Sequence, residues 1–188
     1  MTASAKDLSL RVPIDGRHRK MLIDGTWRDA ASGRSFETRN PATGVVIGTV
    51  PRSDAGDIDL AVAAARRAFE GPWSRFKPYE RQLLLLRIAD LMERHWEEIA
   101  LSDTTDMGMP ITRTLANRNR VLGMLRFYAG MATSIHGQTI GNSLPGEIVS
   151  YTRKEPVGVV GAIIPWNAPA AASIWKSARR SPPAAPSC

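Results

Sequence analysis

Residues Glu155–Pro169 read EPVGVVGAIIPWNAP, and this stretch decides the fold. Its apolar run over 157–164 is β-branched and interrupted only by small residues, which is typical of a strand buried on both faces of a parallel sheet. Pro165–Pro169 break the run, and Ala170–Lys176 then predict the first turns of a helix. A strand, a tight turn and a helix open a nucleotide-binding α/β unit, in which ligands gather at the carboxyl ends of strands.

Two hairpins and three helical stretches are predicted before this unit. An Asp-Gly turn between apolar residues predicts a hairpin over 21–27, and the turn at 40–44 predicts a second hairpin over 36–50. Apolar residues then recur at helical spacing in three stretches, which run from the caps Ser53-Asp54 to Gly71-Pro72, from about 78 to 108, and from about 111 to 135.

The turn-rich segment 137–156 predicts a β-hairpin arm. Residues 148–153 alternate like a strand with one wet face. Because a two-stranded ribbon buries little by itself, we expect this arm to dock on another surface and to serve oligomerisation. An ordinary surface hairpin is the alternative.

Composition excludes several classes of protein. The chain has 188 residues and 43% hydrophobic residues, and its one cysteine, Cys188, excludes an internal disulfide and a CxxC site. Spacing alone builds no metal site from His18, His95 and His136. No apolar run approaches the roughly 20 residues of a membrane span, and the polar, basic start lacks an apolar middle segment. We therefore expect a cytoplasmic protein without a membrane partner.

The net charge of +7 and the pI near 10.2 raise the question of nucleic-acid binding. The basic clusters at 17–20 and 179–180 contain no interleaved aromatic residues and belong to no known DNA- or RNA-binding signature. They predict solvated tails and no nucleic-acid partner. A basic nucleic-acid binder remains the weakest alternative, which a steep salt dependence of retention on DNA or RNA would distinguish.

The stretch 155–169 closely resembles the signature of the NAD(P)-dependent aldehyde dehydrogenase superfamily. Further matches follow in family order and together cover about residues 21–176: Ile23-Asp24-Gly25 with Trp27, Asn40–Gly44, Ala61–Phe69 followed by Trp73, Arg81–Leu86, Asp103–Pro110 and Tyr151–Arg153. The resemblance implies the α/β class and an incomplete aldehyde-dehydrogenase-like fold. In it, N-terminal hairpins and helices lead into the first strand of a Rossmann-like cofactor domain.

The resemblance also implies a division of the chain. The expected parts are a basic disordered tail (1–20), the N-terminal part of the NAD(P)-binding domain (21–136), the oligomerisation arm (137–156), the first strand-turn-helix of the dinucleotide-binding sheet (157–176) and a tail unlike the family (177–188). Intact members of the family are expected to form homo-oligomers through the arm.

The chemistry implied by the resemblance is oxidation of an aldehyde to a carboxylate. Family members bind the aldehyde as a thiohemiacetal on a nucleophilic cysteine, pass hydride to NAD or NADP, and hydrolyse the thioester with a water that a glutamate activates. Asn167 matches the asparagine whose amide donates a hydrogen bond to the oxyanion. An Asx-type turn that caps the next helix is the alternative for this residue.

Five other residues match positions that the family uses around the cofactor. Four of them, Ile163, Ile164, Pro165 and Trp166, match positions that line it, and core packing is the alternative. Lys176 matches a lysine near the water and proton path, and a surface lysine is the alternative. Neither the choice between NAD and NADP nor the identity of the aldehyde is decided by these residues.

After Lys176 the resemblance ends. Segment 177–188 has paired prolines and arginines where the family continues a small apolar helix towards a glycine-cysteine pair. With a suitable choice of codons, the next reading frame of this segment encodes Gly-Ala-Ala-Leu-Ala-Ala-Gly-Cys-Thr-Val-Val. The sequence therefore predicts a truncated or frameshifted end.

Catalysis by these 188 residues alone is not expected. Cys188 lies in a proline-rich tail with no evident source of a lowered pKa, and no segment matches the nucleophile or general-base motif. The sequence predicts an oxidoreductase by family and an inactive fragment by itself. The alternative is a non-catalytic module that pairs with full-length aldehyde dehydrogenase subunits.

Overall fold

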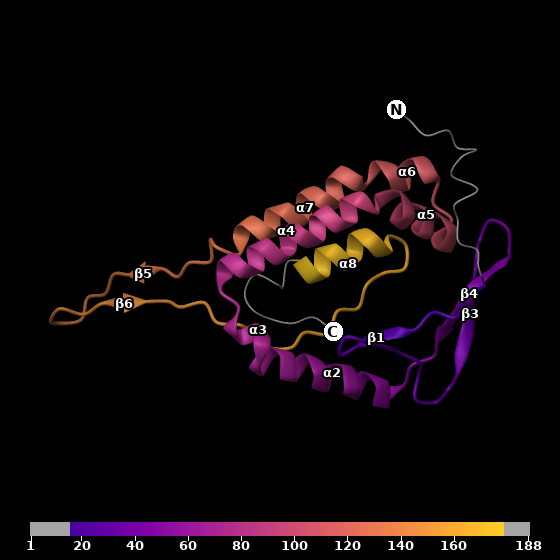
Figure 1. Cartoon of the computed structure of the whole chain (residues 1–188). Helices are drawn as coiled ribbons and strands as arrows, with labels where there is room; N and C mark the ends of the chain where they lie inside the picture. Colours follow the sequence, from indigo (N-terminus) through magenta and orange to yellow (C-terminus); the bar gives the residue numbers. More distant parts are fainter. Residues whose placement is uncertain (1–15, 179–188) are drawn as a thin grey trace.

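A computed structural model describes residues 16–178, so that residues 1–15 and 179–188, with Cys188, lie outside it. Hairpins come first, then a group of helices, a long arm and a last helix (Figure 1). The elements are β1 (Met21–Ile23), β2 (Thr26–Arg28), β3 (Ser35–Arg39), β4 (Val46–Pro51), α2 (Ala55–Glu70), α3 (Pro72–Arg75), α4 (Pro78–Arg94), α5 (Trp96–Met107), α6 (Ile111–Ala116), α7 (Arg118–Met131), β5 (Thr139–Ile140), β6 (Ser150–Tyr151) and α8 (Pro169–Ala178).

Both predicted N-terminal hairpins are confirmed. Asp24 and Gly25 have φ of 54° and 71°, the left-handed values that a tight two-residue turn requires, and β1 pairs antiparallel with β2 across this turn. Gly44, with φ of 72°, lies in the turn between β3 and β4, which also pair antiparallel. Turn chemistry alone was sufficient to locate these hairpins.

Residues 16–20 correct the prediction of a disordered tail over 1–20. The backbone on either side of His18 exchanges hydrogen bonds with Thr49 of β4, at 2.8 and 3.3 Å. The His18 ring bonds to the Thr49 hydroxyl (2.8 Å) and to the Asp29 carboxylate (2.7 Å). The tail prediction is therefore wrong for 16–20, because this basic segment completes the edge of β4.

The first predicted helix is confirmed as α2. Asp54 caps it, because its carboxylate accepts a hydrogen bond from the Gly56 amide at 3.0 Å. The Asp57 carboxylate in turn accepts a hydrogen bond from the Asp54 amide at 3.1 Å. The buried Asp57 carboxylate also accepts from the Ala31 amide at 3.0 Å, which ties the start of α2 to the segment after β2. Such a reciprocal capping box satisfies donors that would otherwise lack partners.

The second and third predicted helical stretches are each divided in two. The stretch predicted over about 78–108 divides at His95, whose ψ of 16° leaves the helical range. The stretch predicted over about 111–135 divides at Asn117. Trp96 explains the first division, because its ring is buried and its indole nitrogen donates to the Leu115 carbonyl of α6 at 3.1 Å. Tertiary packing of one tryptophan therefore sets a boundary that no glycine or proline marks.

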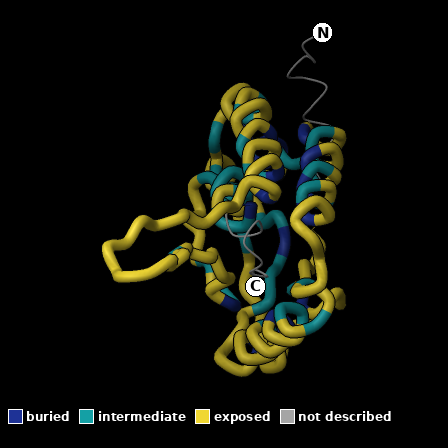
Figure 2. The backbone as a smooth tube through the Cα atoms, turned by 90° about the vertical axis from the view of Figure 1, so that its left-hand side faces the viewer, coloured by how far each residue is buried: buried dark blue, intermediate teal, exposed yellow. Residues whose placement is uncertain are grey.

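The core lies between α4, α7 and α8. Leu85 and Ala89 of α4 pack against Leu125 and Ala129 of α7, and Ala178 of α8 closes the cluster with 1% of its surface exposed. A second cluster gathers Trp96, Ala100 and Val121 at the other end of the helices. Figure 2 shows the buried positions between the helices and the arm exposed along almost its whole length.

The arm is confirmed as a β-hairpin, although only its base is paired. Thr139 and Ile140 of β5 lie opposite Tyr151 and Ser150 of β6, and the tip extends well beyond the helices (Figure 1). Large apolar side chains, such as Val149, are exposed along it.

The segment 157–164 corrects the prediction of a sheet strand. Within residues 16–178 it runs as extended chain with a single bridging residue, Val160, and joins no sheet. A strand of a parallel sheet pairs with at least one neighbouring strand, and the described residues supply none beside this segment. Ile163 is consequently 95% exposed. The helix predicted after it is confirmed as α8.

The α/β class is confirmed, with three small antiparallel sheets and seven helices among the described residues. None of these helices is long and apolar enough to cross a membrane.

Candidate active site

Asn167 lies at an exposed turn directly before α8. The capping position of this helix belongs to Ala168, whose carbonyl accepts from the Ala172 amide at 2.8 Å. The Asn167 side chain forms no hydrogen bond with a residue in 16–178, so nothing there supports the helix-capping alternative.

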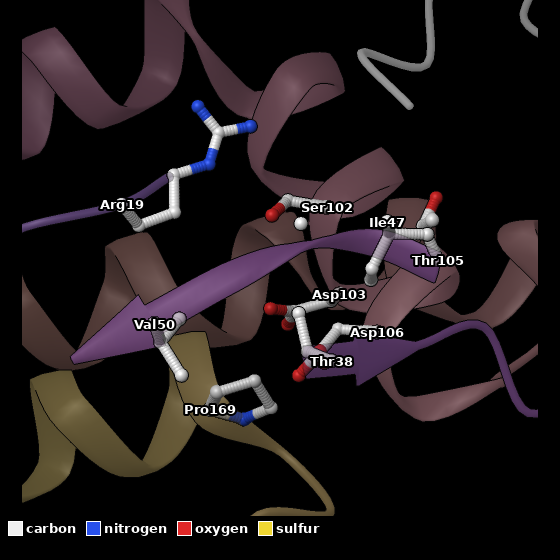
Figure 3. Close-up of a pocket in the computed structure, with 10 residues that line it drawn as sticks. Arg19, Thr38, Ile47, Val50, Ser102, Asp103, Thr105, Asp106 and Pro169 are labelled. Atoms are coloured by element: carbon white, nitrogen blue, oxygen red, sulfur yellow. The ribbon is translucent and has the colours of Figure 1, made fainter. Parts of the chain in front are cut away.

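A cavity of about 290 Å³ lies beside the start of α8 and is lined by β3, β4, α5 and Pro169 (Figure 3). Asp103 of α5 reaches into it and accepts a hydrogen bond from the Ala170 amide in the first turn of α8. Thr38 of β3 donates to the neighbouring Asp106 at 2.7 Å. Asp103 thus fixes the helix that follows Asn167 to the rest of the fold, using an amide that α8 itself cannot satisfy.

Burial raises the pKa of Asp103, and the nearby charge of Asp106 adds to this effect, while the bond from Ala170 opposes it. Because the folded-state pKa lies above the ordinary 3.8, the stability linked to Asp103 is fully present below pH 3.8 and is lost as the pH rises through the raised value.

We therefore predict that Asp103→Asn, which keeps an acceptor for Ala170 but does not titrate, gains stability relative to the native chain between about pH 3 and about pH 6. Urea unfolding of both proteins across this range measures the difference. A difference that is constant with pH would contradict the assignment, and Asp59→Asn, at an exposed position of α2, provides the control.

The four predicted cofactor-lining residues, 163–166, are all exposed rather than packed in the core. Ile163 and Trp166 are 95% and 79% exposed, and the described residues place no sheet strand beside this segment. The assignment of these four residues to the cofactor stays a prediction, as does the alternative of core packing.

A second cavity, of about 420 Å³, lies between α6, α7 and α8. Pro165 and Lys176 both line it, so the structure brings these two predicted residues together. It does not bring Ile163, Ile164 or Trp166 into the same cavity. Arg113, Asn117 and Arg120 also line the cavity, and they were not among the predicted site residues.

A model of the aldehyde dehydrogenase family matches residues 27–180. The chain belongs to the aldehyde dehydrogenase family. It is 43% identical over 176 residues to the mitochondrial benzaldehyde dehydrogenase of Antirrhinum majus, covering 93% of this chain and 33% of the relative. It is 47% identical over 161 residues to a putative aldehyde dehydrogenase of Bacillus subtilis, covering 84% of this chain and 32% of that protein.

The structure agrees with this family. An NAD+ complex of the aldehyde dehydrogenase from Bacillus cereus matches with a TM-score of 0.88 and 40% identity, over 100% of this chain and 37% of that one. The chain spans about a third of the length of the curated relatives it matches.

The range matched by the family model ends at residue 180, four residues after Lys176. Helix α8 continues through Ser177 to Ala178, and Ala178 is buried in the main core cluster. The predicted tail unlike the family over 177–188 stays a prediction.

Proposed function

We propose that this chain supplies the oxyanion donor and part of the cofactor wall of an NAD(P)-dependent aldehyde dehydrogenase, which converts an aldehyde, NAD(P)+ and water to a carboxylate and NAD(P)H. The observation that carries the proposal is Asn167. Its amide lies at an exposed turn with no partner among the described residues, directly before an anchored helix.

The role of Asn167 follows from what an amide can do at a fixed position. An oxyanion that develops on a tetrahedral intermediate is stabilised by donors that are already oriented, and one such donor contributes roughly 3 to 4 kcal/mol to transition-state stability. Here the orientation derives from α8, which Asp103 holds at one end and Ala178 at the other. Both contacts are present without a substrate, so they hold the helix beside Asn167 in place in advance.

For the cofactor we propose the wall made by Ile163, Ile164, Pro165 and Trp166, with Lys176 nearby. A bound NAD or NADP supplies the hydride acceptor. The apolar side chains exclude water from one face of its ring, and the open backbone groups of this segment can bond to the ribose. Support comes from their exposure and from the NAD+ complex of the Bacillus cereus relative.

We propose further that the 188 residues alone are inactive, since their one cysteine, Cys188, lies in a segment unlike the nucleophile motif. Purified chain is expected to reduce neither NAD nor NADP when aldehyde is added, as followed by absorbance of the reduced nicotinamide. Aldehyde-dependent reduction above the rate without protein would contradict this.

A chimera tests the proposed function itself. Residues 16–178 replace the corresponding segment of the Bacillus cereus enzyme, which then supplies the remaining part of the fold. The chimera is expected to oxidise aldehydes with NAD or NADP. A folded chimera with no activity, beside an active parent enzyme, overturns the proposal.

We propose that the arm over 137–156 joins copies of this protein into a homo-oligomer, which its exposed apolar side chains support. Light scattering that gives the monomer mass would contradict this. Pairing with full-length subunits as a non-catalytic module remains the alternative. A cytoplasmic location and the lack of a nucleic-acid partner stay predictions from composition.

A further inference from the structure

The cavity between α6, α7 and α8 is strongly positive. Arg113 of α6 and Arg120 of α7 both line it, Lys176 of α8 adds a third positive side chain, and its lining contains no Asp or Glu. Its volume of about 420 Å³ lies in the range of small-molecule sites. Helix α8 packs against α7, and α6 directly precedes α7 along the chain.

Arg113 and Arg120 differ from two other arginines of α7 in having no acidic partner among the described residues. Arg118 and Arg126 of α7 both pair with Glu93 of α4, the former at 2.6 Å. Arg113 and Arg120 form no ion pair within residues 16–178. Arg113 of α6 and Arg120 of α7 line the cavity on either side of Asn117, where the two helices meet. The sequence thus neutralises the arginines that face α4 and leaves uncompensated those that face α8.

Small side chains on α8 create the room beside these arginines. Ala168, Ala171 and Ala172 line the cavity where longer side chains would fill it. The apolar part of the lining is completed by Trp175, one turn further along the helix. The cavity therefore combines an apolar side with a cationic end.

We propose that this cavity binds an anionic group, a carboxylate or a phosphate, at the far end of the aldehyde substrate. Two guanidinium groups in one cavity repel each other until an anion lies between them, and arginine binds carboxylate and phosphate oxygens through two parallel hydrogen bonds. Pro165 and Ala168, which flank Asn167 in sequence, border the same cavity. An aldehyde whose tail is held by the arginines thus extends towards the oxyanion donor.

That the anion belongs to an aldehyde rests on the proposed function, whereas anion binding itself does not. The test therefore measures binding to the 188-residue chain without turnover. Glutarate, the product expected from a five-carbon aldehyde with a terminal carboxylate, is the first probe and inorganic phosphate the second. Neutral 1,5-pentanediol has the same carbon chain as glutarate. The indole NH resonance of Trp175, assigned with Trp175→Phe, reports on the cavity, and the indole of Trp27 in β2 is an internal control.

Glutarate or phosphate is expected to shift the Trp175 resonance with a millimolar Kd and to leave Trp27 unchanged. Arg113→Gln with Arg120→Gln is expected to raise this Kd at least about tenfold, and each single variant to raise it by less. Arg87→Gln, an exposed arginine of α4 outside the cavity, is expected to have no effect. Phosphate binding without glutarate binding identifies the anion as a phosphate.

Three results would overturn the proposal. The first is a Trp175 resonance that neither anion shifts at about 50 mM, well above a millimolar Kd. The second is an equal shift with 1,5-pentanediol. The third is an equal loss of affinity in Arg87→Gln, which would mean that overall charge attracts the anion. If the chimera is inactive but anion binding holds, the proposed function fails and the anion site stands.

Discussion

Replacing Asn167 with alanine in the chimera is expected to lower kcat for aldehyde oxidation by about 10²- to 10³-fold. The oxyanion exists only in the tetrahedral intermediate and the transition states around it, so a donor aimed at this oxygen contributes little to binding of the ground state. KM should therefore change far less than kcat. Initial rates over a range of aldehyde concentrations separate the two constants.

The matched control for this prediction is Asn119→Ala, at an exposed asparagine of α7 that lines neither cavity. Its kcat should equal that of the unmodified chimera. If Asn167→Ala raises KM and leaves kcat unchanged, Asn167 binds the substrate rather than the oxyanion. If both variants lose activity together, the loss reflects folding of the chimera.

The second large effect is expected in the core, where Leu125→Ala should lower the free energy of unfolding by about 3 to 5 kcal/mol. Leu125 is 1% exposed and packs among side chains of α4, α7 and α8. Rigid helices on three sides prevent collapse of the cavity that the substitution leaves. Urea unfolding measures the loss, which is a large fraction of the stability of an ordinary domain.

Two further variants separate this effect from a general sensitivity of the chain. Leu83→Ala, at a 48% exposed position of α4, should cost less than about 1 kcal/mol. Leu125→Met keeps the volume of the side chain and should cost less than about 1.5 kcal/mol. Equal losses for Leu83→Ala and Leu125→Ala would show that the helices do not pack around Leu125 as described.

Local chemistry predicted the elements whose cause is local. Asp24 and Gly25 accept the left-handed backbone of a tight turn, and Asp54 with Asp57 forms a capping box within four residues of sequence. These signals operate over a few residues, so a single sequence contains all of the information needed. The same holds for the turn at Asn167, which follows directly from the prolines around it.

Elements set by distant contacts could not be predicted in this way. The division at His95 depends on where Trp96 finds its place against α6, and the ordered segment around His18 depends on the edge of β4. The run 157–164 has the composition of a buried strand, but a strand is realised only when neighbouring strands are present. In each case the partner is remote in sequence, and the pattern of the segment itself is silent about it.

For the candidate site, too, local signals were readable from the sequence and contacts between distant segments were not. Asn167 and residues 163–166 were named as site residues because they are contiguous in sequence, and their roles stay predictions. Arg113 and Arg120 looked like polar positions between apolar ones, because only the packing of α8 against α7 turns that face into a cavity. Asp103 was part of a matched segment, yet its bond to the start of α8 became visible only in three dimensions.

The exposed apolar side chains of Val157, Ile163 and Trp166 also bear on how this chain behaves at high concentration. Contiguous apolar surface favours self-association, and a net charge of +7 keeps copies of the chain apart by mutual repulsion. At about 0.1 M salt, repulsion between exposed charges more than about 10 Å apart is largely screened, whereas the apolar attraction remains. The colloidal stability of the chain should accordingly fall as salt is added, so that dilute, low-salt buffers are the conditions in which it can be studied as separate molecules.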